Sequence, residues 1–185
     1  MTSPASSGSN MKLNITPYNQ NDIEELYNVI SASSAHLKPW MPWLHDTYCI
    51  DDTAGWVNLC IKDWEGSSAY RYLIRAADNN KILGAVGIDR IERVHRVAEL
   101  GYWVAANALN RGVATCAARQ AVFNAFLDHA LNRVEIHVLT DNLASNRVAV
   151  KIGAKFEGTF RNKLFHNGHS KAANCYSIIP NDYAT

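Results

Sequence analysis

The sequence predicts one α+β domain built on a mixed, mostly antiparallel sheet. Segments with strand alternation and segments with a helical period follow one another in the order βαα, three strands, α, β, α, β, β. Hydrophobic residues make up 48% of the 185 residues and charged residues 19%, which is typical of a chain with a single core. No internal repeat interrupts this pattern, so we expect about six to seven strands flanked by about four helices.

The first half of the chain begins with MTSPASSGSN, which contains no large apolar side chain after Met1. We therefore expect residues 1–10 to form a flexible tail and residues 11–185 to form the domain. Two prolines keep the segment 37–49 out of a regular helix, although that segment contains two tryptophans. The other predicted elements are a strand at 13–15, helices at 21–30 and 51–64, and antiparallel strands at 70–76, 81–88 and 97–104.

The second half continues with a helix that buries small and apolar residues on one face. Gly153 follows the next, shorter helix at the C′ position, and Asn167-Gly168 is suited to a tight hairpin turn. The predicted elements are helices at 115–130 and 144–152 and strands at 133–139, 155–160 and 172–179.

Charge and cysteine usage exclude several functional classes. Lys and Arg number 18 against 17 Asp and Glu, so the chain lacks the basic excess that non-specific nucleic-acid binding requires. The four cysteines form no CxxC pair, which argues against a zinc site or a disulfide framework. The sequence contains neither a long apolar run nor a secretory signal pattern. We expect a cytoplasmic protein with no nucleic-acid, membrane or metal partner.

The stretch LGYWVAANALNRGVAT at residues 100–115 is the most informative. A strand runs through a short loop into a long helix whose start contains Gly112 and Ala114. Free backbone N–H groups and the helix dipole make such a junction an anion site, which a pyrophosphate could approach closely. Alternatively, Gly112 only permits a sharp loop. The stretch matches neither the Walker pattern nor GxGxxG.

Two motifs together resemble the acetyl-CoA-binding half of the GNAT acetyltransferase superfamily. They are AELGYWVAANALNRGVAT and VEIHVLTDNLASNRVAVKIGAKFEGTFR, and the nearest likeness is to the RimL/RimJ branch, which acetylates ribosomal-protein N-termini. In the superfamily loop Q/R-x-x-G-x-G/A, Gly112 and Ala114 occupy the small positions. Leu109 replaces the leading Gln or Arg, a departure that the RimL-like branch shares. The resemblance covers nearly all of residues 11–182 and is strongest over 98–161.

The resemblance implies an acetyl-CoA-dependent N-acetyltransferase that transfers acetyl directly within a ternary complex. It implies that strand 100–104 binds the pantetheine arm, that the 110–115 backbone holds the pyrophosphate, and that the helix start at 142–146 faces the thioester. A backbone N–H near Trp103 or Val104 can serve the oxyanion. The implied cofactor-binding residues are Tyr102, Trp103, Val104, Leu109, Asn110, Arg111, Gly112, Val113, Ala114, Thr115, Asn142 and Asn146.

Ser145 is the candidate that assists the departing thiolate. Many superfamily members use a tyrosine on the short helix, but the corresponding residue here is Ala149. Ser145 is the RimL-like substitute, and its alternative role is that of an ordinary helix cap.

Glu99 is the candidate base, because strand alternation places it on one face with Gly101 and Trp103. The carboxylate that some RimL-like enzymes use after the FEG segment would fall at Leu164, which cannot accept a proton. Glu99 could instead pair with Arg93 or Arg96, and His137 is a weaker candidate. A water relay could also suffice, since a free α-amine has a pKa of about 7.7–8.0.

The acceptor is the least determined part of the reaction. Trp40 and Trp43 are candidate substrate-binding residues, because two prolines hold their loop away from regular structure. We expect a ribosomal-protein N-terminal amine, or alternatively a small-molecule amine such as an aminoacyl-nucleotide antibiotic or toxin. A non-catalytic acyl-CoA-binding module is the alternative of another class. His166 and His169 indicate a surface hairpin rather than a metal site, and the protein could be a monomer or a homodimer.

Overall fold

The computed structural model describes residues 12–183 and confirms the predicted α+β domain, with one seven-stranded sheet and five α-helices in this part of the chain. The sheet order is β1-β2-β3-β4-β5-β7-β6. The strands are β1 (Leu13–Pro17), β2 (Tyr70–Ala76), β3 (Ile82–Glu92), β4 (Val97–Val104), β5 (Arg133–Leu139), β6 (Lys155–His166) and β7 (His169–Ile178). The helices are α1 (Ile23–Ala32), α2 (Ser34–Leu37), α3 (Ile50–Glu65), α4 (Val113–Leu127) and α5 (Leu143–Lys151). The predicted tail, residues 1–10, lies outside the described residues.

Several element boundaries differ from the sequence prediction; for example, β3 extends to Glu92, and α4 spans Val113–Leu127 where a helix was expected at 115–130. The four-residue helix α2 was not predicted; it comes just before the segment 37–49 that was expected to be irregular and shares only Leu37 with it, and both Ser33 and Leu37 are buried. β6 and β7 extend to a tight turn at Asn167 and Gly168, whose φ angles are 49° and 78°. Most of β6 is exposed, so no apolar alternation marked its full length. Backbone pairing with β7 defines that strand instead.

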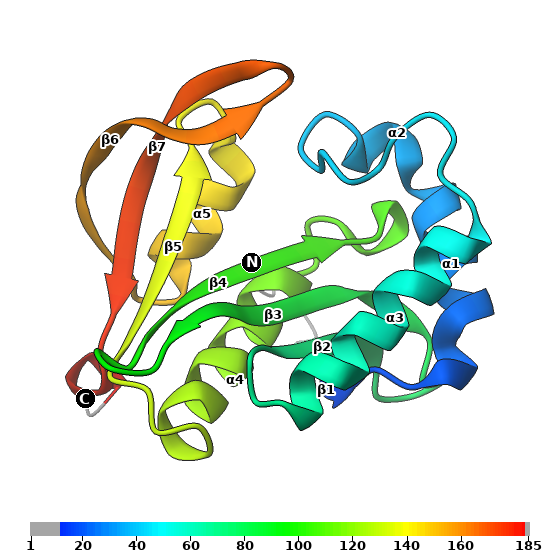
Figure 1. The fold of residues 1–185 in the computed structure, drawn as a ribbon, viewed down its shortest axis with the longest axis horizontal. Coiled ribbons are helices and arrows are strands. Elements are labelled where there is room, and N and C mark those ends of the chain that lie inside the picture. Colours follow the sequence, from blue (N-terminus) through cyan, green and yellow to red (C-terminus); the bar gives the residue numbers. More distant parts are fainter. Residues whose placement is uncertain (1–11, 184–185) are drawn as a thin grey trace, which may run out of the picture.

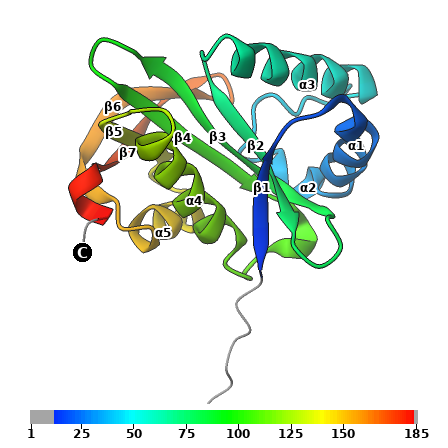
Figure 2. The same ribbon diagram turned by 90° about the horizontal axis from the view of Figure 1, so that it is seen from below.

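Helices cover both faces of the sheet (Figures 1 and 2). On one face, α4 packs against the side chains of β3 and β4, with Val86, Leu100 and Val122 in the larger core. On the other face, α1 and α3 enclose a second core that includes Leu26 and Leu73. Successive residues of β4 therefore point alternately toward the two helical layers.

The sheet divides between β4 and β5. These strands pair in parallel only where residues 97–99 meet residues 133–135, and the other strand pairs are antiparallel. Beyond Glu99 and Glu135 the two strands diverge, as Figure 1 shows. This divergence leaves one edge of β4 without a strand partner among the described residues.

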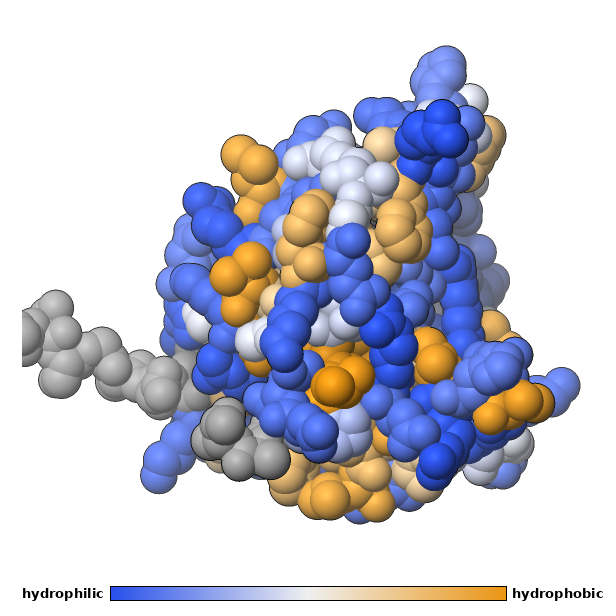
Figure 3. Space-filling view, turned by 90° about the vertical axis from the view of Figure 1, so that its left-hand side faces the viewer, coloured by the Kyte–Doolittle hydropathy of each residue, from blue (hydrophilic) through white to orange (hydrophobic). Residues whose placement is uncertain are grey.

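The strand β6 forms the free edge at the other end of the sheet from β1. Phe156 and Phe160 are exposed there, and Lys155, Glu157 and Arg161 lie between and beside them. Figure 3, which faces this side of the molecule, shows apolar residues scattered among hydrophilic ones. Charged side chains on an edge strand oppose pairing with another chain. Within residues 12–183, none of the helices has the length and apolar character needed to cross a bilayer.

Candidate functional site

The divergence of β4 and β5 opens a cleft of about 520 Å³. β4 and β5 form two walls, the loop before α4 closes one end, and α5 borders the other side. The lining includes Ser145 and most of the predicted cofactor-binding residues, namely Tyr102, Trp103, Val104, Leu109, Asn110, Gly112, Val113, Ala114, Thr115 and Asn142. One cavity thus brings together the residues of both motifs.

The free edge of β4 presents backbone donors to this cleft. The Ala105 amide donates to the Leu83 carbonyl on the β3 side, with a nitrogen–oxygen distance of 2.8 Å. Because neighbouring residues of a strand direct their N–H groups to opposite sides, the amides of Tyr102 and Val104 point into the cleft. The strand geometry therefore favours Val104 over Trp103 as the amide that can serve an oxyanion.

The start of α4 supplies a second set of donors. Gly112 precedes the helix with φ 75°, and Asn110 is also left-handed with φ 57°. No side chain caps the first turn of α4, and that turn contains no acidic residue. A Cβ atom on Gly112 would meet nothing within 4 Å, so the space in front of the helix is open. Uncapped amides, the helix dipole and open space suit a pyrophosphate.

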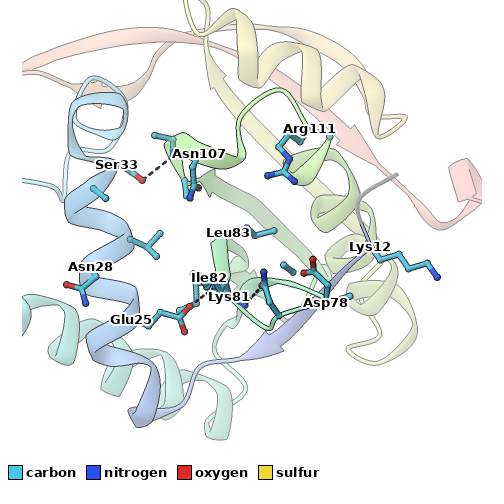
Figure 4. A pocket seen from close by; sticks show the side chains of 18 of the residues that line it. Lys12, Glu25, Asn28, Ser33, Asp78, Lys81, Ile82, Leu83, Asn107 and Arg111 are labelled. Atoms are coloured by element: carbon cyan, nitrogen blue, oxygen red, sulfur yellow. Dashed lines mark hydrogen bonds between the residues drawn. The ribbon is translucent and has the colours of Figure 1, made fainter. Parts of the chain in front are cut away.

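Arg111 lies differently from the other predicted cofactor-binding residues. Its side chain lines a neighbouring hollow of about 1590 Å³ between α1, the β2–β3 turn and the loop before α4 (Figure 4). The cleft between β4 and β5 does not include Arg111 in its lining. The predicted contact of Arg111 with the cofactor stays a prediction.

Ser145 sits in the first turn of α5, where its backbone amide donates to the Asn142 side chain. Its Oγ lies 3.0 Å from the Tyr102 hydroxyl, and the single proton of that phenol can be donated either to Ser145 Oγ or, over 3.1 Å, to the Ser145 carbonyl oxygen. Burial raises the pKa of Tyr102 to about 12, although the hydrogen bond with Ser145 opposes this effect. The phenol therefore stays neutral and holds the Ser145 hydroxyl at the cleft.

Asn146 is fully engaged inside the protein. Its amide nitrogen donates to the carbonyls of Leu139 and Asn142, and its oxygen accepts from Asn174 and Tyr176. These four bonds use the hydrogen-bonding capacity of the amide group. Asn146 fixes the junction of β5, β7 and α5, and its predicted contact with the cofactor stays a prediction.

Glu99 lies at the base of the divergence and lines neither the cleft nor the pocket described below. It pairs with Arg90 at 3.0 Å and lies 3.3 Å from His137 Nδ1, whereas the sequence suggested Arg93 or Arg96. Burial alone would raise the pKa of Glu99, but the hydrogen bond with His137 and the nearby positive charges outweigh it and lower the pKa. A carboxylate held in its charged form is a weak base. The catalytic role of Glu99 stays a prediction.

A second pocket of about 460 Å³ lies on the α1 and α3 face of β4. It shares Met41, Gly101, Tyr102 and Trp103 with the cofactor cleft, so the two cavities meet at the middle of β4. Gly101 is exposed there, and a Cβ atom on it would meet nothing within 4 Å. A group in this pocket could therefore approach the thioester end of the cleft across Gly101.

Aromatic rings form much of the wall of this pocket. Trp43 lies 5.8 Å from Tyr48 and 6.4 Å from Trp103 between ring centroids, and both pairs are tilted by 55°. Trp40, by contrast, lines the cofactor cleft, so the structure divides the predicted tryptophan pair between the two cavities. The sequence reasoning missed Tyr48, Trp56, Arg71 and Asp89, which also line the pocket. Trp56 lies on α3, where a tryptophan would ordinarily be a core residue, but it is 40% exposed and lines this pocket.

The structure also bears on the predicted surface hairpin at His166 and His169 and on the expected absence of a metal site. His166 and His169 do lie at a hairpin, but His166 is buried and its Nε2 lies 2.9 Å from the Pro39 carbonyl oxygen. This contact joins the β6–β7 hairpin to the loop after α2 above the cleft. Elsewhere, Glu135, His137 and Cys175 place ligand-type atoms within 4.8 Å of one another. The expected absence of a metal therefore stays a prediction.

A family model of the acetyltransferase (GNAT) domain matches residues 12–155. This chain belongs to the GNAT acetyltransferase family. The uncharacterized N-acetyltransferase YoaA of Bacillus subtilis (strain 168) is 33% identical over 59% of this chain; the match spans 62% of that relative, less than two thirds of its length. The ribosomal-protein-serine acetyltransferase of Escherichia coli (strain K12) is 25% identical over 86% of this chain and 88% of the relative.

Among solved structures, the microcin C7 self immunity acetyltransferase MccE, in complex with acetyl-CoA and AMP, has a TM-score of 0.84. It is 25% identical and covers 91% of this chain and 92% of that chain. The family match and these relatives confirm the GNAT fold and the ribosomal-acetyltransferase-like resemblance. The chain is an acetyl-CoA-dependent N-acetyltransferase.

We expect Ser145→Ala to lower kcat by roughly 10- to 100-fold with little change in acetyl-CoA affinity. The hydroxyl would contact charge that grows on sulfur only as the bond breaks, and a hydrogen bond to a charged group is worth about 1.5–3 kcal/mol. Steady-state kinetics and calorimetric titration with acetyl-CoA check this. An unaltered kcat would leave Ser145 as a residue of the helix start only.

Proposed function

We propose that this enzyme acetylates the primary amine of a small molecule that carries a planar aromatic group, with an aminoacyl-nucleotide as the model acceptor. The observation that carries the proposal is the aromatic pocket, which meets the cofactor cleft at Gly101. The rings of Trp43, Tyr48 and Trp103 are tilted against one another around this pocket of about 460 Å³. A nucleobase or another flat ring can stack on such a wall.

The similarity to MccE supports this acceptor class, because that protein was solved with both acetyl-CoA and AMP. A ribosomal-protein N-terminal amine is the second candidate, which the similarity to the Escherichia coli ribosomal-protein-serine acetyltransferase favours. In that case the first side chain of the protein would occupy the pocket and the rest of the acceptor would lie outside it.

The proposed chemistry divides between the two cavities. Acetyl-CoA supplies the activated acyl group, with its pyrophosphate at the start of α4 and its thioester near Ser145. The Val104 amide stabilises the negative charge on the carbonyl oxygen. Ser145 Oγ accepts the phenol proton of Tyr102, which leaves its own proton free to be donated to the departing sulfur. The nitrogen–carbon bond forms as the carbon–sulfur bond breaks, and the proton lost by the amine leaves through water. Since an α-amine has a pKa of about 7.7–8.0, part of it is neutral near pH 7.

We expect Trp43→Ala to raise KM for an aminoacyl-nucleotide by an amount equivalent to roughly 1–3 kcal/mol, the usual value of one stacked base. The measurement is thiol release from acetyl-CoA with an aminoacyl-sulfamoyladenosine, a stable aminoacyl-nucleotide analogue, and with serine-initiated peptides. Trp40→Ala is the matched control, because Trp40 lines the other cavity and its loss should affect acetyl-CoA instead. If wild-type enzyme acetylates only the peptides, the ribosomal candidate replaces the first.

A further inference from the structure

The aromatic pocket, from here on the acceptor pocket, is lined by two carboxylates, Asp52 and Asp89. Asp52 Oδ2 already accepts from the Cys49 amide, whereas Asp89 lies near the junction with the cofactor cleft. Asp89 lies on β3, two residues beyond Gly87, and Gly87 pairs with Gly101 across the strands. A Cβ atom on Gly87 would lie 2.8 Å from Asp89 Oδ2. The carboxylate therefore folds back over Gly87 and occupies the space that a side chain there would fill. This brings Oδ2 close to the place where the two cavities meet.

Only one oxygen of Asp89 is engaged. Arg71 donates from Nε to Asp89 Oδ1 over 2.6 Å, while the hydrogen bonds among residues 12–183 leave Oδ2 open. Arg71 itself is tied on its other side to Asp63 at 2.6 Å and lies 4.7 Å from the Trp56 ring centroid. The guanidinium thus fixes Asp89 through Oδ1, and Oδ2 stays available to a ligand.

The two carboxylates that share Arg71 behave differently. Hydrogen bonds from Arg71 and Ser68 lower the pKa of Asp63, which lies outside the pocket lining. Burial, together with the charge of Glu99, raises the pKa of Asp89 despite the same guanidinium. The negative charge of Asp89 is therefore incompletely stabilised. A cation placed beside Oδ2 would supply the missing stabilisation.

We propose that Asp89 Oδ2 binds the ammonium group of the incoming acceptor and so selects amines over neutral molecules of the same shape. This assignment rests on the proposed function insofar as the pocket holds the acceptor. Tilted aromatic rings beside a carboxylate form a cage that suits an ammonium ion attached to an apolar or aromatic body. The amine is held at the junction and meets the thioester after it loses its proton to water.

The test compares binding of benzylamine with that of benzyl alcohol, a neutral molecule of nearly the same size, by calorimetric titration of the full chain. Wild type should prefer benzylamine, and Asp89→Asn should reduce that preference by about tenfold or more. Asp63→Asn is the matched control, because it removes the other partner of Arg71 from outside the pocket and should keep the preference. Gly87→Ala should also reduce it, since the new methyl group would lie 2.8 Å from Oδ2 and 3.1 Å from Arg71 Cγ and so displaces the carboxylate without removing its charge; this variant serves if Asp89→Asn does not fold.

A preference that survives in Asp89→Asn or in Gly87→Ala, or one that is lost equally in Asp63→Asn, overturns the assignment. The absence of any preference in wild type overturns it too. The proposed function fails separately: if wild type acetylates neither the aminoacyl-nucleotide analogue nor the peptides while Asp89 still governs the choice of benzylamine, the ammonium site stands and the acceptor class is wrong.

Discussion

Gly112→Asp is expected to weaken acetyl-CoA binding by roughly 30- to 150-fold, equivalent to about 2–3 kcal/mol. The substitution places bulk and negative charge in the open space before α4, where uncapped amides face the expected pyrophosphate. Repulsion between the carboxylate and the pyrophosphate adds to the loss of room. Calorimetric titration with acetyl-CoA measures the effect directly.

Gly153→Asp is the matched control for this variant. Gly153 also has a positive φ, of 96°, and a Cβ atom there would also meet nothing within 4 Å. Both variants therefore carry the same backbone strain and should lose similar stability, on the order of 1 kcal/mol. Only Gly112 lines the cofactor cleft. Equal acetyl-CoA affinity in the two variants would remove the pyrophosphate assignment.

The cofactor side of the site could be predicted from sequence because it depends on the backbone. A strand, a glycine and the start of a helix follow one another within residues 100–115, so local pattern and local geometry carry the same information. The structure places most of the predicted residues around one cleft. The sequence pattern did not predict that Arg111 lines the hollow beside α1 instead of the cleft. Its neighbours Asn110 and Gly112 both have left-handed backbone conformations, which redirect the loop between them.

The acceptor pocket could not be predicted in the same way. Trp43 lies in the loop after α2, Trp56 on α3, Arg71 on β2 and Asp89 on β3, and only the packing of the sheet and helices brings them together. In the sequence each of these four residues has an ordinary explanation, because aromatic residues are common in loops and on helices and charged residues are common on strands. The ion-pair partner of Glu99 could not be predicted for the same reason. The bulge in the β3–β4 hairpin places Arg90 beside Glu99, although Arg93 and Arg96 are nearer in the sequence.

The placement of Ser145 shows an intermediate case. The motif around residues 142–146 indicated a helix start facing the cofactor, and α5 begins at Leu143 as that motif requires. The hydrogen bond between Ser145 and Tyr102 joins two segments 43 residues apart. Strand alternation places Tyr102 on the face opposite Gly101, yet only the structure shows that this phenol reaches α5.

The meeting of the two cavities leads to the second large effect. We expect Gly101→Leu to lower kcat/KM for the amine acceptor by about 100-fold or more while acetyl-CoA affinity changes little. Because Tyr102 points toward α5, the neighbouring position 101 points toward the acceptor pocket, and a leucine there would fill the junction. The amine must come within about 3–3.5 Å of the thioester carbon, and a displacement of about 1 Å can cost 100-fold.

The fold should tolerate this change, since a Cβ atom on Gly101 meets nothing within 4 Å and its φ is not positive. Gly101→Ala provides a graded comparison with a smaller obstruction and should give an intermediate rate. The measurements are thiol release in the presence of saturating acetyl-CoA, the acetyl-CoA dissociation constant, and thermal unfolding of each variant. If kcat/KM for the acceptor stays at the wild-type level in a folded Gly101→Leu enzyme, the acceptor reaches the cofactor cleft from another direction. The aromatic pocket would then not be the acceptor site.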